Sequence, residues 1–453
     1  MSGIEQNIVT ESEQLDSMLS DAARISMHMT DALPNRTSTM LASAAATSSA
    51  SGSTVSASSA STSVASGSVA SGSTSSTSAI PSTTIAADNV PVMPSSGLLI
   101  VDKPQGVTSH DVVAAARSAL HTKKVGHAGT LDPMATGLLV IGFGNATRLL
   151  NYIVEHDKTY EATIRLGART TTDDADGELI VDEEVVSCET GATTRSLMPS
   201  RERIETMIAE RFTGDIEQVP NTFSAIKING KRAYDLAREG KDVELRSRPV
   251  HISEFIVLDA REGYASTESA ASPLVITPNL ADETVLDNDS VFPVIDVDVR
   301  VSCSSGTYIR ALARDLGEAL GVGGYLTRLR RTRVGRFDVA ATNTVTAHTE
   351  SRTFTNRSGE TVTRNRAVFD QTGTDLAKRT LSMMESVQIA MPTVQITAQD
   401  AVDLRFGRRI PYDIREVTAA YVPANADSDA DVAALIVRVK RGEAKPIVVF
   451  PAS

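Results

Sequence analysis

The stretch that organises this chain is "HAGTLDPMATGLLVIGFG", residues 127–144. Its first part carries one carboxylate, Asp132, among small residues, and Gly129 and Gly137 let the backbone approach a bound group closely. Its second part, "LLVIGFG", is a short apolar run that predicts a buried strand. The stretch therefore predicts a loop that presents a lone carboxylate beside a core strand.

Two interpretations of Asp132 are open from the local sequence. Pro133 disfavours helical geometry at Asp132 and favours a helix start immediately after it, so Asp132 could simply cap a helix. The glycines and the flat polar side chain of His127 favour a functional loop instead. A phosphate-binding loop is disfavoured, because the stretch lacks the Gly-Lys-Ser/Thr ending of that motif.

The segments on either side alternate irregularly between strand and helix patterns. "GLLIVDKP" predicts a strand that stops at Pro104, and the next segment a helix with Ser109 as N-cap. "TYEATIRLG" predicts a strand with Tyr160, Ala162, Ile164 and Leu166 on one face. Residues 201–212 and "GTYIRALARDLGEALG" predict helices, the latter ending at a glycine. This order favours an α+β fold over regular βαβ winding.

Composition limits the class of protein. A chain of 453 residues with 41% hydrophobic residues can build a sizeable core, and two cysteines with no secretory signal favour a reducing, cytoplasmic setting. The longest apolar stretch is interrupted by Asn145 and Arg148, short of the roughly 20 residues that cross a bilayer. We therefore expect no membrane association.

The net charge of −12 is unevenly distributed. Residues 259–292 hold seven acidic residues against one arginine, which marks an acidic insertion. Residues 301–336 reverse this balance with seven arginines and two acids, so this segment is expected to face phosphate.

The chain divides into four regions by composition. Residues 1–96 contain a Ser/Ala-rich run that lacks large apolar side chains, and we expect a disordered tail. Residues 97–345 form the expected main folded domain, and 346–385 are expected to form a polar linker. Residues 386–453 predict a small β-rich module with a hairpin that turns at 441–444 and is a candidate for RNA binding.

One aspartate-rich segment resembles a calcium loop. In "TTDDADGELIVDEE", Thr172, Asp174 and Asp176 take positions one, three and five if Gly177 is the sixth, and Glu183 takes the twelfth. Thr172 stands where the loop needs an aspartate, and the flanking segments look like strands rather than helices. An aspartate-rich turn between strands is therefore favoured.

Two further segments carry candidate binding residues. Arg310 lies about one turn into the predicted helix of "SCSSGTYIRALARDLG", near enough to its N-terminus to pair with a carboxylate from another loop. The alternative is a capped helix with solvated arginines. Residues 221–248 alternate basic and aromatic side chains, which suits a nucleic-acid groove, although interspersed acids also fit a solvated helix face.

Six stretches between residues 97 and 340 together resemble the TruB family of bacterial tRNA pseudouridine synthases, which act on uridine 55 of the T arm. They are "GLLIVDKPQGVTSHDVV", "KKVGHAGTLDPMATGLLVIGFGNATRL", "KTYEATIRLGARTTTDDADGE", "QVPNTFSAIKINGKRAYDLAREG", "CSSGTYIRALARDLG" and "GGYLTRLRRTRVGRF". The resemblance implies a mixed, mainly antiparallel sheet flanked by helices and loops, and no cofactor or metal.

The same resemblance implies a role for each matching residue. Asp132 becomes the nucleophile, while Lys103 and Pro104 support the site. The expected substrate-binding residues are His127, Tyr160, Arg310 and Leu329, with Tyr160 receiving the base and a candidate to assist the final deprotonation at C5. The expected RNA-binding residues are Lys227, Lys231, Arg232, Tyr234, Arg330 and Arg331.

The chemistry explains the lone carboxylate of the opening stretch. Isomerising uridine cuts a C–N glycosidic bond and rejoins the turned uracil through carbon, so one carboxylate suffices because no water is activated. The base must leave its stack to reach that group, which requires a flat receiving side chain. We expect a monomer that acts on the T arm of tRNA without an obligate protein partner. The alternative function is a non-catalytic tRNA-binding and folding chaperone.

Overall fold

A computed structural model describes residues 93–180, 198–222, 227–228, 231–232, 245–276, 291–426 and 428–452. Their largest element is a mixed sheet of eleven strands with the order β15-β14-β1-β3-β12-β4-β11-β10-β7, in which β13 also pairs with β12 and β2 with β3. Only the β1–β14 and β3–β12 contacts within it are parallel. The sheet comprises β1 (Gly97–Lys103), β2 (Val125–Ala128), β3 (Thr136–Phe143), β4 (Lys158–Leu166), β7 (Gly214–Gln218), β10 (Arg248–Ser266), β11 (Val291–Cys303), β12 (Gly324–Val334), β13 (Phe337–Asp338), β14 (Val345–Thr355) and β15 (Thr361–Phe369). The predicted α+β fold is confirmed.

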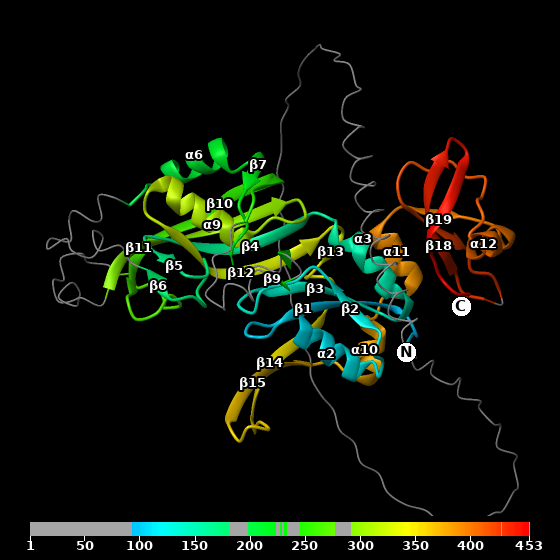
Figure 1. Ribbon diagram of the computed structural model, residues 1–453, viewed down its shortest axis with the longest axis horizontal. Helices are drawn as coiled ribbons and strands as arrows, with labels where there is room; N and C mark the ends of the chain where they lie inside the picture. The colour runs from blue at the N-terminus through cyan, green and yellow to red at the C-terminus, as the bar shows by residue number, and fades with distance from the viewer. Residues whose placement is uncertain are drawn as a thin grey trace, which may run out of the picture. The chain divides into compact units, whose positions relative to one another are not determined.

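One face of the sheet is covered by helices α2 (Ser109–Ala119), α6 (Arg201–Arg211) and α9 (Ile309–Leu320), whose apolar side chains share a core cluster with the strands (Figure 1). The predicted face of β4 lies in this cluster, with Tyr160, Ala162, Ile164 and Leu166 all buried. Helix α9 ends at Gly321, whose φ of 77° is the left-handed conformation that glycine adopts readily. The α2 N-cap is Thr108, one residue before the predicted Ser109, because Thr108 forms a capping box with Asp111.

A second apolar cluster lies on the other face of the sheet. Strand β1 contributes to both clusters, with Leu99 and Val101 in the first and Leu98 and Ile100 in the second. The second cluster also includes side chains from the short helices η1 (Gly144–Leu149), α3 (Leu150–Val154) and α11 (Met383–Ala390). None of the helices in the described ranges has both the length and the apolar content to cross a bilayer.

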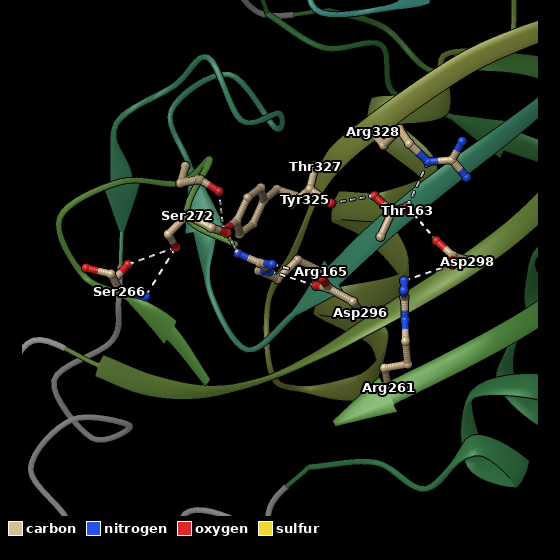
Figure 2. A network of polar contacts seen from close by, with 11 residues as sticks. Thr163, Arg165, Arg261, Ser266, Ser272, Asp296, Asp298, Tyr325, Thr327 and Arg328 are labelled. Carbon is tan, nitrogen blue, oxygen red and sulfur yellow. Dashed lines mark hydrogen bonds and ion pairs between the residues drawn. The ribbon is translucent and has the colours of Figure 1, made fainter. Parts of the chain in front are cut away.

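Farther along the second face, hydrogen bonds link polar side chains of neighbouring strands. Arg165 of β4 forms two hydrogen bonds with Asp296 of β11, at 2.7 and 2.8 Å, and donates a third to the Ser272 carbonyl (Figure 2). Tyr325 of β12 donates to the Ala270 carbonyl at 3.0 Å. These bonds attach the first part of the acidic insertion to the sheet.

The acidic insertion is shorter than predicted. Residues 259–266 belong to β10 and 291–292 to β11, so the strands account for both ends of the predicted range 259–292. Residues 277–290 lie outside the described residues, as does the predicted tail up to residue 92. The first strand begins at Gly97, where the sequence placed the start of the folded part.

The predicted polar linker at 346–385 is wrong. Strand β14 extends the large sheet beside β1 and forms a hairpin with β15, which Figure 1 shows as a two-stranded arm. Helix α10 (Gly373–Arg379) follows it. The sequence did not predict this hairpin, because its strands are polar and threonine-rich and show no apolar periodicity. Pairing of β14 with β1 fixes the position of the hairpin instead.

The C-terminal residues form the predicted small β-rich module around their own apolar cluster. Its hairpin turns between Lys440 and Glu443, as predicted. The predicted boundary at 386 falls inside α11, which packs in the second core cluster. The module comprises β16 (Thr393–Gln395), α12 (Ala398–Arg405), β17 (Thr418–Val422), β18 (Asp431–Lys440) and β19 (Glu443–Val449).

Candidate active site

The loop that carries Asp132 connects β2 to β3 and contains no helix, so the helix-cap interpretation of Asp132 is wrong. Ser109 holds the loop from α2: its hydroxyl accepts from the Leu131 amide at 2.9 Å and donates to the Leu131 carbonyl at 3.2 Å. The amide of Gly106 donates to the Pro133 carbonyl at 2.8 Å. The loop is therefore fixed on both sides of Asp132.

Lys103 supports the same loop from the end of β1. Its fully buried ammonium donates to the carbonyls of Val107 at 2.7 Å, Pro104 at 3.0 Å and Pro133 at 3.3 Å. Burial lowers the pKa of Lys103 to about 8, against the raising effect of Asp132. The supporting position predicted for Lys103 is present in the structure.

Gly137 explains why small residues follow Asp132. Its φ is 97°, and a Cβ atom there would lie 2.3 Å from the Arg331 carbonyl oxygen. Any other residue would therefore separate β3 from β12 where the two strands pair.

A pocket of about 280 Å³ opens beside Asp132. Its lining comes from the Asp132 loop, from strands β4 and β12, and from the segment that leads into α9. The lining includes Asp132, Lys158, Tyr160, Arg310, Leu329 and Arg331. Four of the residues predicted from separate motifs, Asp132, Tyr160, Arg310 and Leu329, thus meet at one cavity.

The predicted pairing of Arg310 with a carboxylate from another loop is confirmed. Arg310 lies in the first turn of α9, and its Nε is 3.0 Å from Oδ2 of Asp132. The arginine side chain is 6% exposed, whereas that of Asp132 is 37% exposed. A guanidinium at this distance fixes the direction of the carboxylate, which remains accessible at the wall of the pocket.

Asp174 is a site residue that the sequence analysis assigned to a different role. Its buried carboxylate lies 3.3 Å from Nη1 of Arg310, which also donates to the Thr172 carbonyl at 3.0 Å. Burial raises the pKa of Asp174, which opposes the effect of Arg310. Asp174 therefore holds the arginine that holds Asp132, and its signal was the aspartate-rich turn itself.

The calcium-loop interpretation gains no support from this geometry. The turn lies between strands β5 (Arg169–Thr170) and β6 (Leu179–Ile180) and not between helices. Its twelfth position, Glu183, lies outside the described residues. The described part of the chain contains no cluster of three or more His, Cys, Asp or Glu side chains suited to a metal.

Tyr160 and Leu329 form the apolar wall of the pocket from adjacent strands, 8% and 5% exposed. Burial raises the pKa of the Tyr160 phenol, so the ring is neutral at physiological pH. A neutral aromatic ring beside an aliphatic side chain suits the stacking of a flat base.

Arg331 is buried in the structure although it lines the pocket, and its predicted RNA-binding role stays a prediction. It is 1% exposed, and its guanidinium donates to the carbonyls of Leu138 at 2.8 Å and Gly129 at 3.0 Å. Its neighbour Arg330 forms a bidentate, half-buried ion pair with Asp102. Arg331 thus braces the strand and loop on either side of Asp132.

His127 lies on β2, outside the set of residues that line the pocket. Its ring meets His110 edge to face with centroids 5.7 Å apart. Burial lowers the pKa of His127 to about 4, helped by His110 and Arg331, so the ring is neutral at physiological pH. Its role toward the substrate stays a prediction.

The predicted RNA-gripping segment is described only in part. Strands β8 (Lys227–Ile228) and β9 (Lys231–Arg232) pair with each other, and Tyr234 lies outside the described residues. The RNA-binding roles of Lys227, Lys231, Arg232 and Tyr234 stay predictions.

Comparison with known proteins identifies the family to which the chain belongs, which is one of pseudouridine synthases. The "TruB family pseudouridylate synthase (N terminal domain)" matches residues 117–273, "tRNA pseudouridylate synthase B C-terminal domain" matches 310–362, and "tRNA Pseudouridine synthase II, C terminal" matches 391–451. The chain belongs to the TruB family of pseudouridylate synthases.

Curated relatives match over most of their own length. The tRNA pseudouridine synthase B of Bifidobacterium longum strain DJO10A is 58% identical over 392 residues, covering 79% of this chain and 98% of the relative. The tRNA pseudouridine synthase B of Arthrobacter strain FB24 is 42% identical over 363 residues, covering 79% and 97%. Among solved structures, a Cbf5-Nop10-Gar1 complex contains a chain with 22% identity and a TM-score of 0.48, covering 79% of this chain and 84% of that one.

Proposed function

We propose that this protein isomerises uridine 55 in the T arm of tRNAs to pseudouridine, with Asp132 as the nucleophile. The observation that carries the proposal is the accessible Asp132 carboxylate, held by the buried Arg310 in a pocket with an aromatic and aliphatic wall. The names of the family and of the curated relatives support the substrate class.

Different residues of the pocket bind the base and react with the nucleotide. The flipped uracil stacks against Tyr160 and Leu329, which places the sugar near Asp132. Asp132 then attacks C1′ as the N1–C1′ bond breaks, adds to C6, or removes a sugar proton, and in each route the carboxylate is released again when uracil C5 has bonded to C1′ and lost its proton. Tyr160, with its raised pKa, serves as a stacking surface and donor and not as a base at neutral pH.

We also infer that the enzyme acts as a monomer in the cytoplasm and requires no cofactor. A chaperone without chemistry would need no positioned carboxylate, so the Asp132–Arg310 pair favours the catalytic function over that alternative.

The proposal is tested by tritium release from tRNA labelled at uridine C5. Wild-type protein is expected to release tritium from the T arm, and Asp132→Asn to lose about 10⁴-fold or more in rate while binding tRNA normally. The exposed Asp259→Asn, the same substitution far from the pocket, is the matched control and should match wild type. Tight tRNA binding with no release by the wild type would overturn the enzyme and favour the chaperone.

A further inference from the structure

The hairpin of β14 and β15 leaves the sheet at the edge that carries Asp132. Strand β14 pairs with β1 only at Val101 and Asp102 and then continues past the end of β1 at Lys103. Strand β3 begins at that same edge, opposite Lys103, and the Asp132 loop immediately precedes it. From Glu350 to Thr355 the arm adds roughly 17–20 Å of strand beyond this edge at about 3.3 Å per residue.

One face of the hairpin is tied to the catalytic loop. Its base, including Ala367 and Phe369, lies in the core cluster that also contains Tyr160. Farther out, Asn365 donates to the Gly106 carbonyl at 2.9 Å, and the Gly106 amide donates to the Pro133 carbonyl at 2.8 Å. The arm and the Asp132 loop are thus joined through a single turn.

The opposite face carries an arginine pair. Arg352 and Arg364 are exposed and stand directly opposite each other in the strand register. The next pair toward the base is Glu350 with Arg366, which form an ion pair, whereas neither Arg352 nor Arg364 pairs with a carboxylate of the described residues. Like charges directly opposite each other on a sheet are destabilising, so folding alone does not account for this arrangement.

The surroundings of the pair match a nucleic acid. Phe354, 40% exposed, follows on the same face, and the exposed Arg357 lies at the turn. Residues 350–366 hold four arginines and two glutamates, in a chain whose net charge is −12. Guanidinium groups beside an exposed aromatic ring are suited to phosphates and bases.

We propose that the hairpin is an RNA-binding arm in which Arg352 and Arg364 bind phosphates of the tRNA substrate. This inference rests on the proposed function, because it assigns the arm's ligand to the substrate of the same enzyme. Phosphate binding relieves the repulsion between the two guanidinium groups. Because the arm leaves the sheet at the edge that carries Asp132, it can contact phosphates of an RNA whose target base lies in the pocket.

The test is the double variant Arg352→Gln/Arg364→Gln, assayed with full-length tRNA over a range of salt concentrations. The KM for tRNA is expected to rise about tenfold, and the slope of log KM against log salt to fall by about 1 to 2, with kcat unchanged. Arg352→Lys/Arg364→Lys, which keeps both charges, should retain most of the salt slope. The unfolding midpoint of the Gln variant should be unchanged or higher, since a repulsion is removed.

The matched control is Arg203→Gln/Arg211→Gln, which removes two exposed arginines from α6. This helix packs on β10, at the opposite end of the sheet order from β14 and β15. An unchanged KM and salt slope in the Arg352→Gln/Arg364→Gln variant would contradict the proposal that the hairpin binds RNA. Equal effects in the control variant would contradict it as well. Failure of the wild type to release tritium would instead overturn the proposed function, so the two failures are distinct.

Discussion

Two buried arginines of this protein each hold a carboxylate, and the two carboxylates differ in their exposure. Arg165 and Arg310 are 2% and 6% exposed, but Asp296 is 8% exposed and Asp132 is 37% exposed. Arg165 forms two hydrogen bonds with Asp296 (Figure 2), whereas Arg310 places one Nε at 3.0 Å from Asp132 and another nitrogen near Asp174. The first pair is closed and structural, and the second leaves its acid available to a ligand.

The difference indicates that one kind of interaction serves stability at Arg165 and, under the proposed function, chemistry at Arg310. A buried charge that loses its partner costs several kcal/mol, so a closed pair is essential to folding once it is present. A carboxylate at the wall of a pocket keeps part of its contact with water and is replaced at lower cost. Substitutions should therefore separate the two pairs by the property that they change.

The largest effect on stability is expected from Asp296→Asn. The substitution leaves Arg165 charged and buried without its carboxylate, so the free energy of unfolding should fall by about 3 kcal/mol. Urea unfolding measures this change, and Asp259→Asn, at an exposed position, should stay within about 0.5 kcal/mol of wild type. A stable Asp296→Asn protein would show that the closed pair is not structural.

Arg310→Lys should lower kcat by about 10²-fold, because an ammonium cannot hold Asp132, Asp174 and the Thr172 carbonyl in one geometry. Steady-state kinetics on tRNA measures the loss. The same substitution in the closed pair, Arg165→Lys, should lower stability and leave the rate per folded molecule unchanged. Equal losses of rate in the two variants would remove the distinction between the pairs.

Lys103 extends the comparison to a cation that bonds only to carbonyls. Its pKa is lowered to about 8, so the activity should fall as the pH rises through about 8, when the neutral amine has fewer hydrogens for its three acceptors. In the unfolded chain the lysine stays protonated up to its ordinary pKa of about 10.4, so the unfolded state binds more protons between these values. Stability from this group therefore rises over the window in which activity falls.

A pH–rate profile, measured together with unfolding curves at each pH, tests whether stability rises while activity falls above about pH 8. Lys158 also lines the pocket and has its pKa lowered to about 8 by burial, so the profile is repeated in Lys158→Arg, where that position stays charged. The alkaline fall should persist in that variant. Its disappearance would assign the titration to Lys158 instead.

The smallest effect is expected at the contact between the hairpin and the turn that holds the Asp132 loop. Asn365→Ala removes the bond to Gly106, which is worth about 1 kcal/mol, so kcat should fall about two- to fivefold. Thr363→Ala, nearer the tip of the hairpin, has no contact with the loop and should leave kcat unchanged. Equal kcat values in the two variants would show that the loop is positioned without the arm.

The sequence predicted much of the fold because several segments carry their own signals. The apolar run after Gly137, the alternation from Tyr160 to Leu166 and the helix that ends at Gly321 all lie where the local pattern placed them. The pairing of Arg310 with a loop carboxylate was also predictable, since its place in the first turn of a helix limits its reach.

The errors arose where distant segments decide the environment. The turn that carries Asp174 was predicted, but its contact with Arg310 was not, because that arginine comes from another part of the chain. The burial of Arg331 was not predicted, because it depends on the pairing of β12 with β3 and β4. The hairpin looked like a linker because its residues are polar on both faces, and the edge of β1 fixes its course. Contacts between segments that are distant in the sequence determine each of these features, and the local sequence pattern does not predict such contacts.

The most direct test of the account measures two properties of Asp132→Asn on one preparation, the single-turnover rate on tRNA and the free energy of unfolding in urea. The rate should fall about 10⁴-fold or more, whereas the free energy of unfolding should stay within about 1 kcal/mol of wild type, because Arg310 keeps its contact with Asp174. A variant that keeps its rate, or that loses several kcal/mol of stability as Asp296→Asn should, would contradict the assignment of Asp132 as an accessible nucleophile.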